Sequence, residues 1–188
     1  MKENILIVDD EPDIRDVISV ILNDEGYNTN CVSNAQEAQA KINIEIPSLI
    51  ILDIWMRDST MDGLSLLNWI KDSNPEIPVL MISGHGTVEI AVNAIKAGAY
   101  DFIEKPFKSE KLLFMVSRAL ENSELKKENE ELKQQVRRTD MIVGKSSIIN
   151  SVRQTIAKVS QTNSRVLILG SSGSGKESCA ESSPFGPL

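Results

Sequence analysis

Residues 5–10 read ILIVDD and residues 49–53 read LIILD, two short apolar runs that each end in aspartate. Runs of this length that are rich in β-branched residues are typical of strands buried on both faces of a parallel sheet. In open α/β sheets, ligands bind beyond the carboxyl ends of the strands. We therefore expect Asp9, Asp10 and Asp53 to lie together at one edge of such a sheet.

Three neighbouring carboxylates repel one another unless a hard cation lies between them. Lys105 follows the strand-like residues 101–104 and precedes Pro106, so it brings a positive charge to the same edge. Phosphoryl transfer depends mainly on positioning and charge neutralisation. The set therefore predicts a magnesium site at which Asp53 accepts a phosphoryl group, and the alternative is an inert metal site or helix-capping aspartates.

The first 121 residues alternate between strand and helix patterns. Strands are predicted over residues 5–8, 27–32, 49–52, 79–82 and 101–104, with a helix after each. Ser33 and Gln36 have the spacing of a capping box at the start of the second helix. This alternation predicts an α/β fold, a doubly wound five-stranded parallel sheet with helices on both faces.

The helix that begins after Ser109 is predicted to continue to about residue 138, because residues 112–138 contain neither proline nor glycine. Part of this segment repeats every seven residues, as shown by Asn122, Leu125, Asn129, Leu132 and Val136. Such spacing fits a short two-stranded coiled coil with asparagine at some core positions. The alternative is a solvated single helix that acts as a spacer.

The last part of the chain carries a second motif. A helix is predicted over residues 148–159 and a strand over residues 165–169, followed by GSSGSGK at residues 170–176. This matches the phosphate-binding loop GxxxxGK, whose candidate ligands are Gly170, Gly173, Gly175 and Lys176. Residues 178–188 lack the apolar helix that should follow, so we expect an incomplete P-loop fragment that does not bind or hydrolyse ATP.

The composition is that of a globular chain: 188 residues, 41% hydrophobic and 25% charged, with a net charge of -7. The negative charge argues against direct nucleic-acid binding. No run is long enough to span a membrane and no signal peptide opens the chain, so we expect a cytoplasmic protein without membrane contact. Cys31 and Cys179 lie far apart in unlike contexts, which indicates no disulfide framework.

Four motifs occur in a fixed order: ILIVDDE at residues 5–11, ILDIW at 51–55, MISGHG at 81–86 and DFIEKPF at 101–107. Together they resemble the response-regulator receiver domain over about residues 3–121. Within this family the chain resembles more closely the NtrX-type branch of the NtrC family. Members of that branch join a receiver to an ATPase that acts on sigma-54 RNA polymerase and to a DNA-binding helix-turn-helix. The loop between Asp53 and Gly63 departs from the common pattern, because it is longer and lacks the usual Met-Pro step.

The resemblance implies a flavodoxin-like (CheY-like) strand order, 2-1-3-4-5. It also implies a receiver domain over residues 1–121, a helical linker over 122–139, an N-terminal fragment of the sigma-54 interaction domain over 140–177 and a non-family tail over 178–188.

The resemblance further assigns roles in the phosphoryl site. Asp53 would be the phosphoacceptor and Lys105 would pair with the phosphoryl group. Mg2+ would be bound by Asp53, by Asp10, by Asp9 directly or through water, and by the backbone carbonyl of Trp55.

Two further residues would act as the switch. Ser83 would hydrogen-bond the phosphoryl oxygen, and Tyr100 would change rotamer with it. A sensor histidine kinase would donate the phosphoryl group, and a homodimer would form through the face after Thr87 and the linker helix. We expect no enzyme activity beyond catalysis of the chain's own phosphorylation. The alternatives are a P-loop ATPase fragment with a regulatory receiver, and a protein that binds partners without phosphorylation.

Overall fold

The computed structural model describes residues 3–57, 59–84, 87–139, 146–159, 166–174 and 176. The chain divides into two compact units, Met1–Lys126 and Lys127–Leu188.

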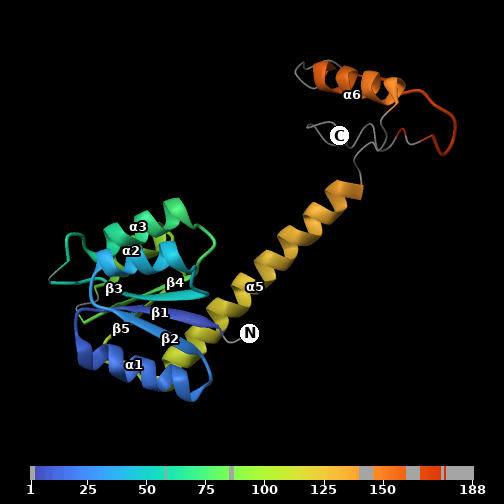
Figure 1. Cartoon of the computed structure of the whole chain (residues 1–188). Coiled ribbons are helices and arrows are strands. Elements are labelled where there is room, and N and C mark those ends of the chain that lie inside the picture. The colour runs from blue at the N-terminus through green and yellow to red at the C-terminus, as the bar shows by residue number, and fades with distance from the viewer. Residues whose placement is uncertain are drawn as a thin grey trace. The chain divides into compact units, whose positions relative to one another are not determined.

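The first unit is built on a five-stranded parallel sheet in the order β2-β1-β3-β4-β5 (Figure 1). The strands are β1 (Asn4–Val8), β2 (Asn28–Val32), β3 (Leu49–Asp53), β4 (Val79–Ser83) and β5 (Asp101–Glu104). Every residue of β3 and β4 is buried, as expected for central strands covered on both faces. The predicted strand order and sheet type are confirmed.

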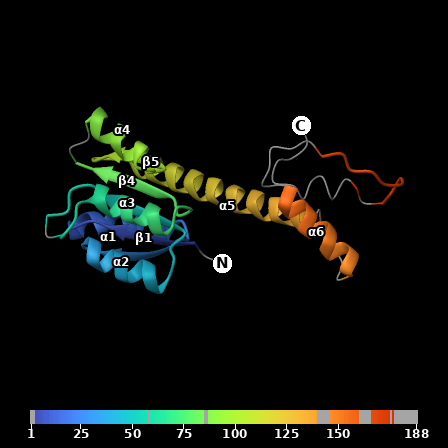
Figure 2. The ribbon, with the colours of Figure 1, turned by 90° about the horizontal axis from the view of Figure 1, so that it is seen from above.

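Helices cover both faces of the sheet (Figure 1 and Figure 2). They are α1 (Pro12–Asp24), α2 (Ala35–Ile44), α3 (Gly63–Ser73), α4 (Val88–Lys96) and α5 (Ser109–Thr139). The α1/α5 core consists of Ile5, Ile7, Ile18, Leu22, Leu49, Ile51, Leu80, Ile82, Ile103, Leu112, Val116 and Ala119. The α2/α3/α4 core packs on the other face and includes Leu6, Val8, Leu52, Leu66, Met81 and Ala94.

Strand parity explains these two cores. Successive side chains of a strand point to opposite faces, so alternate residues of β1, β3 and β4 enter different cores. The uninterrupted apolar runs of the sequence therefore supply two hydrophobic layers at once.

The start of α2 differs from the prediction. Asn34, not Ser33, is the N-cap, and its side chain accepts a hydrogen bond from the Glu37 backbone N–H at 2.9 Å. Glu37 in turn accepts from the Ser33 backbone N–H at 3.0 Å. The predicted pairing of Ser33 with Gln36 was wrong, because the helix begins one residue later and places Glu37 at the third helical position.

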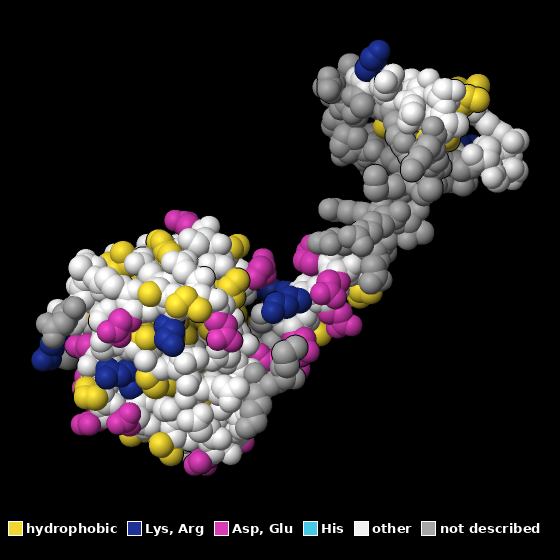
Figure 3. Space-filling view, viewed as in Figure 1, with side chains coloured by type: hydrophobic (Ala, Val, Ile, Leu, Met, Phe, Trp, Pro, Cys, Tyr) yellow, Lys and Arg dark blue, Asp and Glu magenta, His cyan; other side chains and the backbone are white. Residues whose placement is uncertain are grey.

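The long α5 confirms the predicted continuous helix. Its first turns bury Leu112, Val116 and Ala119, whereas Leu125 and Leu132 are 59% and 52% exposed. The exposed part carries acidic and basic side chains with scattered hydrophobic ones (Figure 3).

In the second unit, α6 (Ser147–Val159) agrees with the predicted helix. The predicted strand over residues 165–169 was wrong for the described residues 166–169, which form no strand and are all exposed. A strand needs a hydrogen-bonded neighbour, and the described residues of the second unit include no strand that could pair with it. Among the described helices, none is both long and apolar enough to cross a membrane.

Candidate functional site

The acids predicted from the two apolar runs meet at the carboxyl edge of the sheet. Val8 of β1 is level with Leu52 of β3, so the following residues, Asp9 and Asp53, lie side by side. One carboxylate oxygen from each of Asp9, Asp10 and Asp53 lies within 4.8 Å of the others. Asp9 and Asp53 are buried, with exposed fractions of 0% and 3%.

Lys105 joins this cluster from the end of β5. The backbone N–H of Lys105 donates to the carbonyl of Ser83 at 2.8 Å, which fixes the chain just beyond β4. The Lys105 ammonium lies 2.7 Å from Asp9 Oδ2, 3.3 Å from Asp53 Oδ1 and 3.5 Å from Glu11 Oε1. The predicted counter-charge is therefore in place, and the bond between Lys105 and Pro106 is cis.

Burial dominates the electrostatics of the site. It raises the pKa of Asp53 to about 6, against the lowering effect of the Lys105 charge, and the neighbouring Asp9 and Asp10 raise it further. Burial also raises the pKa of Asp9, although its hydrogen bond with Lys105 opposes this. For Lys105, burial favours a lower pKa, but the hydrogen bond with Asp9 and the charge of Asp53 outweigh it and the pKa is raised.

The donor set fits a hard divalent cation. Asp53 Oδ1 is buried and accepts no hydrogen bond from the residues that the structure describes, with the Lys105 ammonium as an ion-pair neighbour at 3.3 Å. A buried carboxylate oxygen without a hydrogen bond is costly, and coordination to a cation would satisfy it. Carboxylate oxygens are the ligands that Mg2+ prefers, and each of the three aspartates offers one.

Glycine is required where α3 begins, directly behind the phosphoacceptor candidate. A Cβ at Gly63 would lie 2.1 Å from the Asp53 carbonyl oxygen and 2.8 Å from Ile54 Cα. The backbone N–H of Gly63 donates to the Ile54 carbonyl at 2.9 Å. Close approach of two backbones thus ties the end of β3 to α3.

The two residues of the predicted switch pair lie on opposite faces of the sheet, and their switch roles stay predictions. Ser83 is fully buried at the end of β4, and by strand alternation it faces the same side as Met81, toward the α2/α3/α4 core. Tyr100 instead packs against the α1/α5 core on the other face of the sheet. Phe102 of β5 packs on the Ser83 side. The sequence reasoning did not consider it, and strand alternation alone does not separate it from Tyr100, which lies two residues earlier and just before β5.

The loop after β3 also contacts the acids. Trp55, whose carbonyl is a predicted ligand, has a half-exposed side chain. The backbone N–H of Arg57 donates to Asp10 Oδ2 at 3.1 Å. The metal role of the Trp55 carbonyl stays a prediction.

The P-loop candidates lie in the second unit. Gly173 has a φ of +76°, and the Lys176 ammonium donates to the Ser171 carbonyl at 3.1 Å. Gly170 and Ser174 lie close together, since a Cβ at Gly170 would be 2.5 Å from Ser174 Oγ. Gly175 lies outside the described residues, and nucleotide binding here stays untested.

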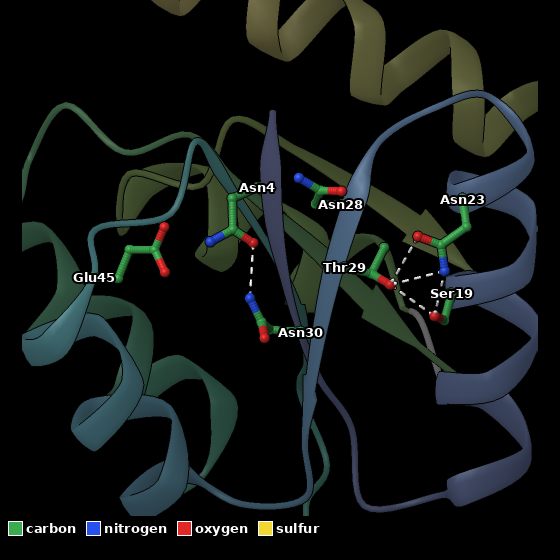
Figure 4. Close-up of a pocket in the computed structure, with 7 residues that line it drawn as sticks. All are labelled: Asn4, Ser19, Asn23, Asn28, Thr29, Asn30 and Glu45. Carbon is green, nitrogen blue, oxygen red and sulfur yellow. Dashed lines mark hydrogen bonds between the residues drawn. The ribbon is translucent and has the colours of Figure 1, made fainter. Parts of the chain in front are cut away.

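An open polar pocket lies away from the acids. It is lined by Asn4, Ser19, Asn23, Asn28, Thr29, Asn30 and Glu45 (Figure 4). Asn4 and Asn28 begin β1 and β2, whereas the acids follow the opposite ends of the strands. Asn30 donates to Asn4 on one side of β2, while Ser19, Asn23 and Thr29 hydrogen-bond on the other. The pocket side chains thus largely satisfy one another, and the pocket is separate from the carboxylate site.

Comparison with known proteins places both parts of the chain. Residues 5–117 match the response regulator receiver domain, and residues 143–182 match the sigma-54 interaction domain. The nitrogen assimilation regulatory protein NtrX of Azorhizobium caulinodans is 53% identical over 177 residues, which cover 94% of this chain and 39% of that protein. The chain thus spans about two fifths of the length of this relative.

Two solved structures cover the receiver. The receiver domain of NtrX from Brucella abortus is 56% identical with a TM-score of 0.61, and the match covers 62% of this chain and 98% of that one. The beryllofluoride-activated NtrC4 receiver domain dimer is 42% identical with a TM-score of 0.61, covering 64% of this chain and 98% of that one.

Proposed function

This chain belongs to the response-regulator family as a receiver of the NtrX/NtrC type, and we propose that Asp53 is its phosphoacceptor, with Mg2+ held by Asp9, Asp10 and Asp53. Receivers of this type are phosphorylated on an aspartate by sensor kinases. The observation that carries the proposal is the buried oxygen Asp53 Oδ1, which lies 3.3 Å from the Lys105 ammonium and accepts no hydrogen bond within the described part of the chain.

The chemistry follows from this placement. A carboxylate oxygen of Asp53 forms a bond to phosphorus as the bond between phosphorus and the kinase histidine nitrogen breaks. Bound Mg2+ would neutralise charge on the phosphoryl oxygens. Lys105 offers a second positive charge to the incoming group, and its contact with Asp9 holds it at the edge of the sheet.

The switch follows from the added charge. A phosphoryl group brings nearly two negative charges and three acceptor oxygens. Ser83 ends the strand next to β3 and is the hydroxyl placed to donate to them. Because Ser83 and Phe102 share one face of the sheet, we propose Phe102, rather than Tyr100, as the aromatic residue that responds.

Magnesium-dependent labelling tests the phosphoacceptor. Incubation of the whole chain with acetyl phosphate or phosphoramidate should add one phosphoryl group, seen by intact mass, only when Mg2+ is present. Asp53→Asn should remove the adduct, whereas Asp72→Asn, at an exposed position on α3, should keep it. An adduct that persists in Asp53→Asn would contradict the assignment. Absence of any adduct on folded wild type would favour a protein that binds partners without phosphorylation.

We also propose that the receiver pairs with a second copy of itself, as the activated NtrC4 receiver does. The supporting surface has two parts. On α4, Val88, Val92 and Ile95 are 83%, 44% and 46% exposed at helical spacing; on α5, Leu125 and Leu132 are also exposed. The face after Thr87 and the linker helix therefore both present apolar side chains.

The linker contribution can be measured by light scattering after size exclusion. Leu125→Asp with Leu132→Asp should weaken the dimer by at least about a hundredfold, because each buried leucine contributes roughly 1.5–3 kcal/mol. Ile44→Asp, at an 83% exposed residue ending α2, should leave the dimer unchanged. A dimer of unaltered affinity in the double variant would show that α5 acts only as a spacer.

A further inference from the structure

The loop between β3 and α3 is attached to α2 by three contacts far apart in sequence. Ser59 Oγ accepts a hydrogen bond from the Ala35 backbone N–H at 3.1 Å. The side-chain amide of Gln36 donates to the Thr60 hydroxyl. The amide of Gln39 lies 3.9 Å from the sulfur of Met61, which packs against the α2/α3/α4 core.

The capping arrangement of α2 explains why these groups are available. The Asn34 side chain accepts a hydrogen bond from the Glu37 N–H, and the Glu37 carboxylate accepts one from the Ser33 N–H. The helix start is therefore capped without Gln36. The Ala35 N–H belongs to the first helical residue and has no partner within the helix, and Ser59 provides one.

The same loop reaches the acids at its other end. Met56 is buried, and the backbone N–H of Arg57 donates to Asp10 Oδ2 at 3.1 Å. Asp10 is only partly buried, unlike Asp9 and Asp53, so fewer surrounding atoms restrict its carboxylate. The described loop residues 57 and 59–61 therefore connect one acid of the site to the first turn of α2.

We propose that Ser59 and Gln36 are positioning residues for the metal site: by anchoring the loop to α2 they hold the Arg57 N–H against Asp10 and orient its carboxylate toward the cation. This rests on the proposed role of Asp10 as a magnesium ligand. Groups that hydrogen-bond a ligand fix its orientation, and their loss typically weakens metal binding by 10–100-fold. Ser59 and Gln36 do not contact Asp10 and act through the Arg57 N–H, so we expect their removal to weaken Mg2+ binding by only roughly threefold to tenfold.

Calorimetric titration of the whole chain with MgCl2 tests the anchor. Gln36→Ala combined with Ser59→Ala should raise the Mg2+ dissociation constant by roughly threefold to tenfold. The Arg57 amide should exchange with solvent faster, as seen by NMR. The single variant Ser59→Thr, with Gln36 unchanged, keeps the hydroxyl. Its Mg2+ dissociation constant and its Arg57 amide exchange rate should equal those of the wild type. Ser73→Ala, on an exposed turn of α3, is the matched control and should change neither.

A double-mutant cycle separates positioning from a purely structural role. In an Asp10→Ala background, which has no side-chain oxygen to orient, the anchor substitutions should no longer alter Mg2+ affinity. An equal loss in both backgrounds, or unchanged Mg2+ affinity despite faster Arg57 exchange, would overturn the inference. Failure of the wild-type chain to bind Mg2+ would instead count against the proposed function.

Discussion

Gly63→Ala is expected to destabilise the receiver by about 3 kcal/mol, the upper end of the cost of overpacking. The added Cβ would lie 2.1 Å from the Asp53 carbonyl oxygen and within 2.9 Å of two further backbone atoms at the end of β3. Backbone cannot swing aside as a flexible side chain can, so either α3 or the end of β3 must move. Urea unfolding monitored by circular dichroism would measure the loss.

Gly84→Ala is the matched control, because its Cβ would meet no atom of the described residues within 4 Å, its chain neighbours aside, and its φ is not positive. It should change the free energy of unfolding by no more than about 1 kcal/mol. The clash at Gly63 involves the backbone of Asp53, the proposed phosphoacceptor. Any folded Gly63→Ala protein should therefore be phosphorylated by acetyl phosphate more slowly than the wild type. Equal stability of the two variants would contradict the close approach of β3 and α3.

Asp53→Asn is expected to stabilise the metal-free protein at pH 8 by up to about 3 kcal/mol. The reason is that the pKa of Asp53 is raised from 3.8 to about 6, mainly by burial, so the folded state disfavours its ionised form. A shift of about two units corresponds to roughly 3 kcal/mol. The amide that replaces the carboxylate would remain neutral at every pH and would escape this cost.

The sign of the pH dependence follows. Because the folded pKa is raised, the contribution of Asp53 to stability is complete below about pH 4 and is lost as the pH rises through about 6. In EDTA, wild type should therefore lose stability relative to Asp53→Asn between pH 4 and pH 7. Added Mg2+ should narrow the difference by binding the ionised wild-type site. Parallel pH curves for the two proteins in EDTA would disprove this account.

The strands and the acid site could be predicted from the sequence because one signal fixes both. An apolar run such as residues 49–52 must be buried on two faces, and the polar residue that ends it must emerge at the sheet edge. Asp9 and Asp53 follow such runs, whereas Lys105 follows the mixed strand DFIE at residues 101–104, and the structure brings the three together. The order of the strands came from the family resemblance rather than from the runs themselves.

Other features depend on local geometry and long-range contacts, which the hydrophobic pattern of the sequence does not report. The cap of α2 moved by one residue, because Asn34 and Glu37 compete with Ser33 and Gln36 for the same geometry. Tyr100 and Phe102 are two residues apart, so strand alternation alone would place them on one face. Tyr100 instead precedes β5 and packs against the α1/α5 core, which the sequence pattern does not report. The contact between Ser59 and Ala35 joins residues 24 apart, and no local periodicity reports it.

The position of Lys105 between the acids has a consequence for electroneutrality. With all three aspartates ionised, the site holds three negative charges against one ammonium, and a divalent cation would bring the sum to zero. Salt screens such a partly buried group of charges poorly, so the repulsion among the acids persists at moderate ionic strength. Lys105→Ala would leave the metal-loaded site one negative charge in excess, and Lys105→Arg would keep the balance while changing the shape of the donor.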